Sequence, residues 1–182
     1  VIDRHEALRS TFSSDGMSIL VHPSVTIDVP VHDLSDLPQV ERESETALIL
    51  QQEGQRLYDL NEGPLVTFHI IKLSQSEHML VFSLNMIICD GWGYNVVLEE
   101  ISELYSAYVE DRAPALRPIV PMRTYAEWLS RPEQQASAAE SEAFWLAKFP
   151  DVPPPLDLPS YRPRPKSRTY EGERYSLRLP AS

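Results

Sequence analysis

The sequence from Leu80 to Tyr105, LVFSLNMIICDGWGYNVVLEEISELY, joins two different hydrophobic patterns around one turn. Its first residues, Leu80–Leu84, form an apolar run typical of a strand buried on both faces. The run breaks at Asp90-Gly91, and a helical period follows from Gly93. One helical face is then apolar, with Glu99, Glu100 and Glu103 largely opposite: Val96, Val97, Ile101, Leu104 and Tyr105. A strand that turns into a helix brings its last residues to the mouth of a cleft, where they can meet a ligand.

The composition indicates an acidic globular protein. Its 182 residues are 42% hydrophobic, enough for one core-bearing domain. The formal net charge of -11 leaves no basic stripe for phosphates, which argues against a nucleic-acid binder. No apolar run is long enough to span a membrane, and the N-terminus does not read as a signal peptide, so we expect a cytoplasmic protein. The single cysteine, Cys89, excludes an internal disulfide and a multi-cysteine metal site.

Turn residues and hydrophobic periods divide the rest of the chain into short elements. We expect helices at Val1–Phe12, Leu37–Leu57, Thr124–Leu129 and Glu133–Phe149, with Thr124 near an N-cap. We expect strands at Ser18–Val21, Val25–Val31, Leu65–Leu73, His78–Leu84 and Glu173–Leu179, the third and fourth forming an antiparallel hairpin.

Five motifs in one order resemble the condensation domains of nonribosomal peptide synthetases. The first is H-E-x-L-R-x-x-F from His5, and another is the Asp-Gly-Trp half of H-H-x-x-x-D-G-W at Asp90. Asn85 and Met86 stand where this family has its two histidines. The remaining motifs are D-L-x-x-G-P-L from Asp59, F-W-L-A-K-F from Phe144, and L-D-L-P-S from Leu156 followed by R-P-R-P from Arg162.

This resemblance implies an α/β fold of the chloramphenicol-acetyltransferase type, a two-layer sandwich. It predicts that residues 1–150 form the N-terminal condensation lobe, without its first few dozen residues. Residues 151–182 would be a proline-rich connector and the first strand towards the C-terminal lobe. The chain starts at Val1, within an expected helix, and we therefore expect an excerpt of a longer polypeptide.

In the family, carrier proteins deliver substrates on phosphopantetheine arms, and the domain itself binds no cofactor. The second motif histidine works where a neutral imidazole can accept a proton or orient an amine. Met86 occupies that position, and a thioether holds no titratable proton. The resemblance also implies a structural ion pair between Arg9 and Asp90. Gly91 would supply backbone freedom, and Gly93 replaces a family serine, which leaves helix capping to Asp90 or a backbone group.

Several functions stay open at this stage. In the first hypothesis, the domain is catalytically silent and docks carrier proteins, neighbouring synthetase domains or a recruited tailoring enzyme. Alternatively it is active, either through Asn85 and Asp90, as in the cyclisation subgroup that carries D-x-x-x-x-D, or by positioning two reactive groups without a proton carrier. A free-standing acyltransferase acting on a diffusible thioester is the alternative from another class.

The residues alone suggest plainer roles for the same positions. The apolar neighbours Ile87 and Ile88 indicate that Met86 is a core residue of a buried strand. Cys89 reads as an inert buried thiol whose surroundings raise its pKa. His69, in the middle of a strand next to the motif, is a candidate for a substitute base.

Overall fold

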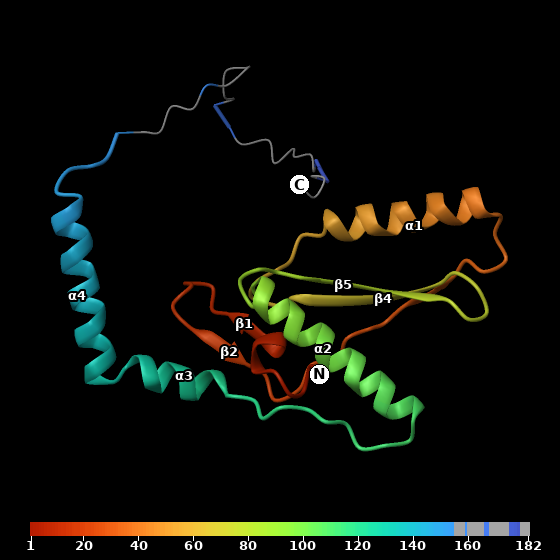
Figure 1. The fold of residues 1–182 in the computed structure, drawn as a ribbon, viewed down its shortest axis with the longest axis horizontal. Coiled ribbons are helices and arrows are strands. Elements are labelled where there is room, and N and C mark those ends of the chain that lie inside the picture. The colour runs from red at the N-terminus through yellow and green to blue at the C-terminus, as the bar shows by residue number, and fades with distance from the viewer. Residues whose placement is uncertain (155–158, 160–165, 168–174, 179–182) are drawn as a thin grey trace. The chain divides into compact units, whose positions relative to one another are not determined.

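The computed structural model describes residues 1–154, 159, 166–167 and 175–178. The chain divides into two compact units, Val1–Gln135 and Ala136–Ser182. All strands of the described residues lie in the first unit, together with helices α1, α2 and α3 (Figure 1). The mixed α/β class predicted from the sequence is confirmed.

The main sheet contains β3 (Val31–Asp33), β4 (Val66–Lys72) and β5 (His78–Leu84), in that spatial order. Strand β3 runs parallel to β4, whereas β4 and β5 form an antiparallel hairpin in which Val66 lies opposite Leu84. The hairpin predicted from the two apolar runs is therefore confirmed.

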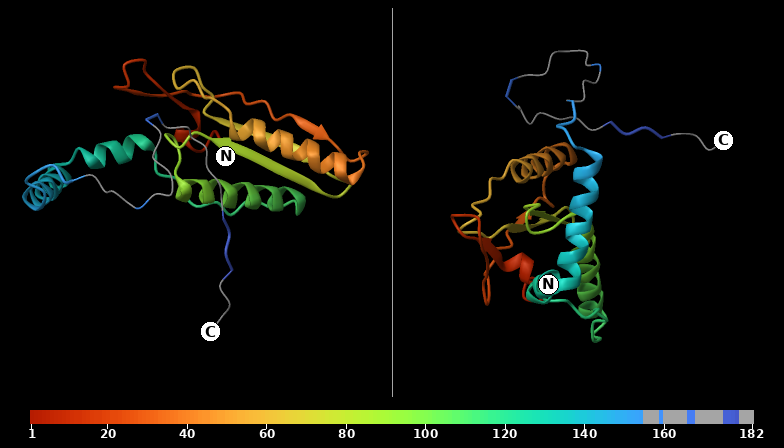
Figure 2. Two further views of the ribbon diagram at one scale, coloured as in Figure 1. Left: turned by 90° about the horizontal axis from the view of Figure 1, so that it is seen from above. Right: turned by 90° about the vertical axis from the view of Figure 1, so that its left-hand side faces the viewer.

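One helix covers each face of this sheet. Successive strand residues point to opposite faces. Val66 and Phe68 face α2 (Gly91–Val109) and form a buried core with Leu8, Phe82 and Val97. Thr67 and His69 face α1 (Gln39–Gly54) instead, where both contact Glu53. Figures 1 and 2 show α1 on one side of the sheet and α2 on the other.

The N-terminal segment is not the helix that we predicted for Val1–Phe12. It forms a 3-10 turn, η1 (Glu6–Arg9), and then a strand, β1 (Ser10–Phe12). This strand pairs with β2 (Ile19–Val21) across the hairpin, and both Ser10 and Thr11 are buried. The helical prediction is wrong because pairing with β2 is a tertiary contact that a local period does not contain.

The second N-terminal strand is also shorter than predicted. Of the expected strand Val25–Val31, only Val31 belongs to β3. Pro30 has no N–H to donate to a ladder, and its carbonyl accepts a hydrogen bond from Ile70 N–H at 2.9 Å. Val25, Ile27 and Val29 instead line an apolar pocket beside the main sheet.

The C-terminal helices lie close to their predicted positions. Helix α3 spans Met122–Leu129 with Pro121 at its N-cap, a few residues before the predicted cap at Thr124. Helix α4 spans Pro132–Lys148, as predicted within a few residues. The predicted strand Glu173–Leu179 lies outside the described residues except for 175–178, which form no strand. The lobe boundary at residue 150 stays a prediction.

Candidate functional site

The turn between β5 and α2 is built by Asn85. Its backbone N–H donates to Leu65 O at 2.9 Å, directly after the last residue of β5. Its side-chain Oδ1 accepts a hydrogen bond from Ile87 N–H at 3.0 Å, and its carbonyl accepts one from Ile88 N–H at 3.1 Å. An asparagine that bonds the backbone two residues ahead is an Asx turn. The Oδ1 atom of Asn85 therefore has a structural role in this turn.

This turn places Met86 at the surface. Met86 is 78% exposed, and Ile87 beside it is 50% exposed. The interpretation of Met86 as strand core is wrong, because β5 ends at Leu84 and the Asx turn redirects the chain. Met86 lines a pocket of about 470 Å³ between the turn, the N-terminal segment and the first turns of α2. The pocket is lined by His5, Ala7, Leu8, Met86, Ile87, Ile88, Cys89, Asp90, Gly93, Val96 and Val97.

Asp90 begins α2 as its N-cap. Its backbone is extended, and its Oδ1 accepts a hydrogen bond from Gly93 N–H at 2.8 Å. An N-cap carboxylate satisfies one of the free N–H groups of the first turn and interacts favourably with the helix dipole. With glycine at position 93, the cap is thus provided by Asp90.

The two glycines of the turn differ from our expectation. A Cβ atom added at Gly91 would meet no atom within 4 Å, and its φ is not positive, so neither close approach nor backbone freedom explains this glycine. A Cβ atom added at Gly93 would lie 2.7 Å from Cys89 Sγ. The glycine that a close approach requires is therefore Gly93 and not Gly91.

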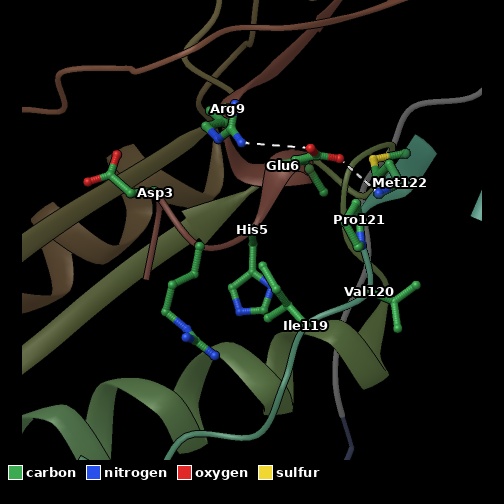
Figure 3. Close-up of a pocket in the computed structure, with 10 residues that line it drawn as sticks. Asp3, His5, Glu6, Arg9, Ile119, Val120, Pro121 and Met122 are labelled. Atoms are coloured by element: carbon green, nitrogen blue, oxygen red, sulfur yellow. Dashed lines mark hydrogen bonds and ion pairs between the residues drawn. The ribbon is translucent and has the colours of Figure 1, made fainter. Parts of the chain in front are cut away.

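Arg9 and Asp90 do not form the expected ion pair among the described residues. The Arg9 guanidinium donates to His22 O and lies 3.9 Å from Glu6 Oε1 (Figure 3). Its Nε is buried without a hydrogen-bond partner in the part of the chain that the structure describes. The physical reason is that Glu6 in η1 and His22, directly after β2, offer acceptors to Arg9, while the Asp90 carboxylate is used as the helix cap.

His69 does not reach this pocket. It lies on the α1 face of β4, where its Nε2 is 3.0 Å from Glu53 Oε1 and its Nδ1 is 3.0 Å from His32 Nε2. The alternation of the strand puts it on the opposite face from Phe68, which packs towards α2. The proposal of His69 as a substitute base at the motif turn is therefore not supported.

Cys89 is a half-buried free thiol in the wall of the pocket. Burial, together with the nearby Asp90 carboxylate, raises the pKa of Cys89 above its ordinary value. The thiolate is the nucleophilic form of cysteine, so the raised pKa lowers the reactivity of this side chain at neutral pH.

Glu100 is a site residue that we placed on the wrong face of α2. It is only 8% exposed, and it binds Arg4 Nε at 3.1 Å and His5 Nε2 at 2.9 Å. A buried carboxylate needs such partners, because desolvation of an unpaired charge is costly. The helical spacing contained the signal: Glu100 lies three residues after Val97 and four before Leu104, on the face that packs inward.

The described residues contain neither a metal-binding cluster nor a membrane-spanning helix. No group of three or more histidine, cysteine, aspartate or glutamate side chains there could hold a metal ion. None of the helices in the described part of the chain is long and apolar enough to cross a lipid bilayer.

Comparison with known proteins identifies the family. The family model of condensation domains matches residues 1–182. The chain belongs to the condensation-domain family. This condensation-domain chain is 35% identical over 182 residues to a linear gramicidin synthase of Brevibacillus parabrevis, covering 98% of the chain and 4% of that synthase. It is 32% identical over 186 residues to phosphinothricin tripeptide synthetase PhsB of Streptomyces viridochromogenes, covering 100% of the chain and 16% of that protein.

Solved structures show the same fold. The condensation-domain chain matches the starter condensation domain of rhizomide synthetase RzmA with a TM-score of 0.71 and 25% identity, over 81% of this chain and 36% of that chain. It matches the EpoB cyclization-docking bidomain from Sorangium cellulosum with a TM-score of 0.68 and 24% identity, over 88% of this chain and 31% of that chain. The described fold thus corresponds to about a third of those two structures.

Proposed function

We propose that this chain is part of a condensation domain of a modular nonribosomal peptide synthetase or hybrid polyketide/peptide synthase. The domain handles acyl or peptidyl thioesters carried on the phosphopantetheine arms of carrier proteins. Its partners are those carriers, the remaining lobe of the domain and the neighbouring synthetase domains. The family match over residues 1–182 and the similarity to gramicidin and phosphinothricin synthetase proteins support this proposal.

We further propose that amide formation by this domain is reduced or absent. The supporting observation is Met86: it is 78% exposed at the pocket of the motif turn, and it cannot take up a proton. General acid–base catalysis typically raises a reaction rate by about 10²–10⁴-fold. The absence of a proton acceptor at position 86 slows the reaction of a thioester with an amine, and positioning of the two groups contributes to the remaining rate.

Catalysis through Asn85 and Asp90 is the weaker alternative. Asn85 Oδ1 is held by Ile87 N–H, and Asp90 Oδ1 is held by Gly93 N–H. Both oxygens therefore have structural roles, in the turn and in the helix cap that shape the pocket. These contacts favour docking or positioning over a cyclisation-like pair of catalytic side chains.

The test uses the protein with purified upstream and downstream carriers, each loaded with its substrate, and the same carriers unloaded as the control. We expect loaded carriers to bind and amide product to form slowly or not at all. Asn85→Ala would lower stability, since it removes the Asx turn, but would leave the rate per folded molecule unchanged. Absence of binding to every loaded carrier would overturn the proposed function. A rapid native reaction that Asn85→Ala abolishes would favour the cyclisation-like alternative.

A further inference from the structure

His5 lies at the wall between two pockets. One is the pocket of Met86 and Asp90 described above. The other is a smaller pocket of about 200 Å³, formed by the N-terminal segment and the chain from Ile119 to Met122 (Figure 3). In Figure 3 the imidazole of His5 extends from the start of η1 towards α2. Among the residues that line the Met86 pocket in the described part of the chain, His5 is the one with an imidazole.

The contact with Glu100 determines which ring nitrogen of His5 carries the hydrogen. His5 Nε2 lies 2.9 Å from Glu100 Oε2. Burial raises the pKa of Glu100, but hydrogen bonds from Arg4 and His5 outweigh this effect, and the pKa lies below its ordinary value of 4.5. Glu100 is therefore ionised at neutral pH and can only accept hydrogen bonds.

It follows that Nε2 is the protonated nitrogen of the neutral ring, and Nδ1 holds the free lone pair. No group in the described residues forms a hydrogen bond with Nδ1 of His5. A carboxylate that orients a histidine in this way also stabilises the imidazolium that forms on proton uptake, as in hydrolase triads. The charged and titratable groups around His5 come from several segments: Asp3, Arg4, Glu6 and Arg9 beside it, Glu100 on α2, and Cys89 and Asp90 at the motif turn.

We propose that His5, held by Glu100, is the proton-accepting group of this pocket in place of the side chain missing at Met86. The inference rests on the proposed function and specifies its chemistry. The amine nitrogen attacks the thioester carbonyl carbon, and the new C–N bond forms as the carbonyl electrons move to oxygen. The amine proton passes to His5 Nδ1. The carbonyl re-forms, the C–S bond breaks, and the imidazolium returns the proton to the leaving sulfur, giving an amide and a thiol.

The test measures how the single-turnover rate of amide formation by the native protein, with loaded carriers, depends on pH between pH 5 and 8. This is the range in which histidine side chains change charge. For the native protein we expect a rate that falls on acidification. His5→Gln should lower the rate at pH 8 by about 10²-fold. It should also abolish the decrease in rate on acidification. A Gln amide still donates to Glu100 from the position of Nε2, so the buried carboxylate keeps a partner.

Two further variants, each checked for folding, separate the role of His5 from a general loss of stability. Glu100→Gln leaves His5 in place but removes the charge that orients it, and we expect about a tenfold lower rate. His78→Gln makes the same change at an exposed histidine at the start of β5 and should leave the profile unchanged. Thermal melting and carrier binding are measured for every variant.

Three results would overturn the inference, and they are distinguishable from failure of the proposed function. His5→Gln with the native rate and pH profile would exclude the role of His5 and leave the proposed function intact. A native protein that binds loaded carriers without forming product would exclude this role and leave a docking function. If no loaded carrier binds, the proposed function itself fails, and the inference fails with it.

Discussion

Replacement of Glu53 by glutamine tests the packing of α1 on the main sheet. The side chain of Glu53 is only 5% exposed. Its carboxylate accepts hydrogen bonds from Arg56 Nη2 at 2.6 Å and from Thr67 Oγ1 at 2.7 Å, and its Oε1 lies 3.0 Å from His69 Nε2. A glutamine keeps the volume but has one acceptor oxygen, and its NH₂ group would face donors. Glu53→Gln therefore leaves buried donors without an acceptor.

The magnitude follows from the pKa of Glu53. The Arg56 hydrogen bond, followed by weaker contributions from Thr67 and His69, lowers the pKa of Glu53 from 4.5 to about 2, against the opposing effect of burial. Holding a carboxyl pKa at about 2 in the folded state stabilises the protein by about 3 kcal/mol at neutral pH. Because the Arg56 side chain is 40% exposed, solvent screens the pair, and we expect about 2 kcal/mol.

The pH dependence has a definite sign. The pKa of Glu53 is depressed on folding, so its stabilisation is fully present above pH 4.5 and is lost as the pH falls towards 2. Urea denaturation followed by tryptophan fluorescence should therefore show Glu53→Gln less stable than the native protein by about 2 kcal/mol at pH 7, with a smaller difference at pH 3. Glu45→Gln, at an exposed glutamate of the same helix, is the matched control and should change stability little.

Two results would refute this reasoning. One is a difference at pH 7 below about 0.5 kcal/mol, the range of ordinary surface substitutions. The other is a difference that stays the same at pH 7 and pH 3, because this would assign the loss to packing and not to the charge of Glu53.

Further predictions concern the motif turn. Asp90→Ala removes the N-cap of α2 and should lower the free energy of unfolding, measured in urea, by about 1 kcal/mol. Asp90→Asn should restore most of this loss. Equal stabilities of the native protein and the two variants would contradict the capping role of Asp90. Gly93→Ala places a Cβ atom 2.7 Å from Cys89 Sγ, so the thiol must move to make room. We expect Gly93→Ala/Cys89→Ala to be more stable than the two single substitutions together predict, and additive effects of the two substitutions would be evidence against the close contact. The raised pKa of Cys89 predicts alkylation by iodoacetamide at pH 8 several-fold slower than for a free thiol, with an increase in Asp90→Asn; reaction at the rate of a free thiol would contradict it.

Local patterns were sufficient for the β4–β5 hairpin and for helices α1, α2 and α4. These elements have long periods and clear turn residues, and their boundaries agree within a few residues. The N-terminal helix was wrong because β1 is stabilised by its pairing with β2. The N-terminal start of α3 differs because Pro121, with its fixed φ, begins the helix before Thr124.

The site was less predictable than the fold because its contacts join distant residues. Met86 was assigned to a strand core, since its neighbours Ile87 and Ile88 are apolar, but an Asx turn made by Asn85 exposes it. The buried carboxylate of Glu100 is paired with Arg4 and His5, which lie more than 90 residues earlier in the sequence. No local pattern contains such partners, although the helical spacing of Glu100 indicated the inward face.

The central claim is that position 86 borders the reaction pocket and lacks a proton acceptor. The most direct measurement is the single-turnover rate of amide formation by the native protein and by Met86→His, with the same loaded carriers, at saturating concentration and pH 7.5. The account predicts that the histidine raises the rate by about 10²-fold or more without changing carrier binding. Equal rates for the two proteins, with both folded and both binding carriers, would contradict it.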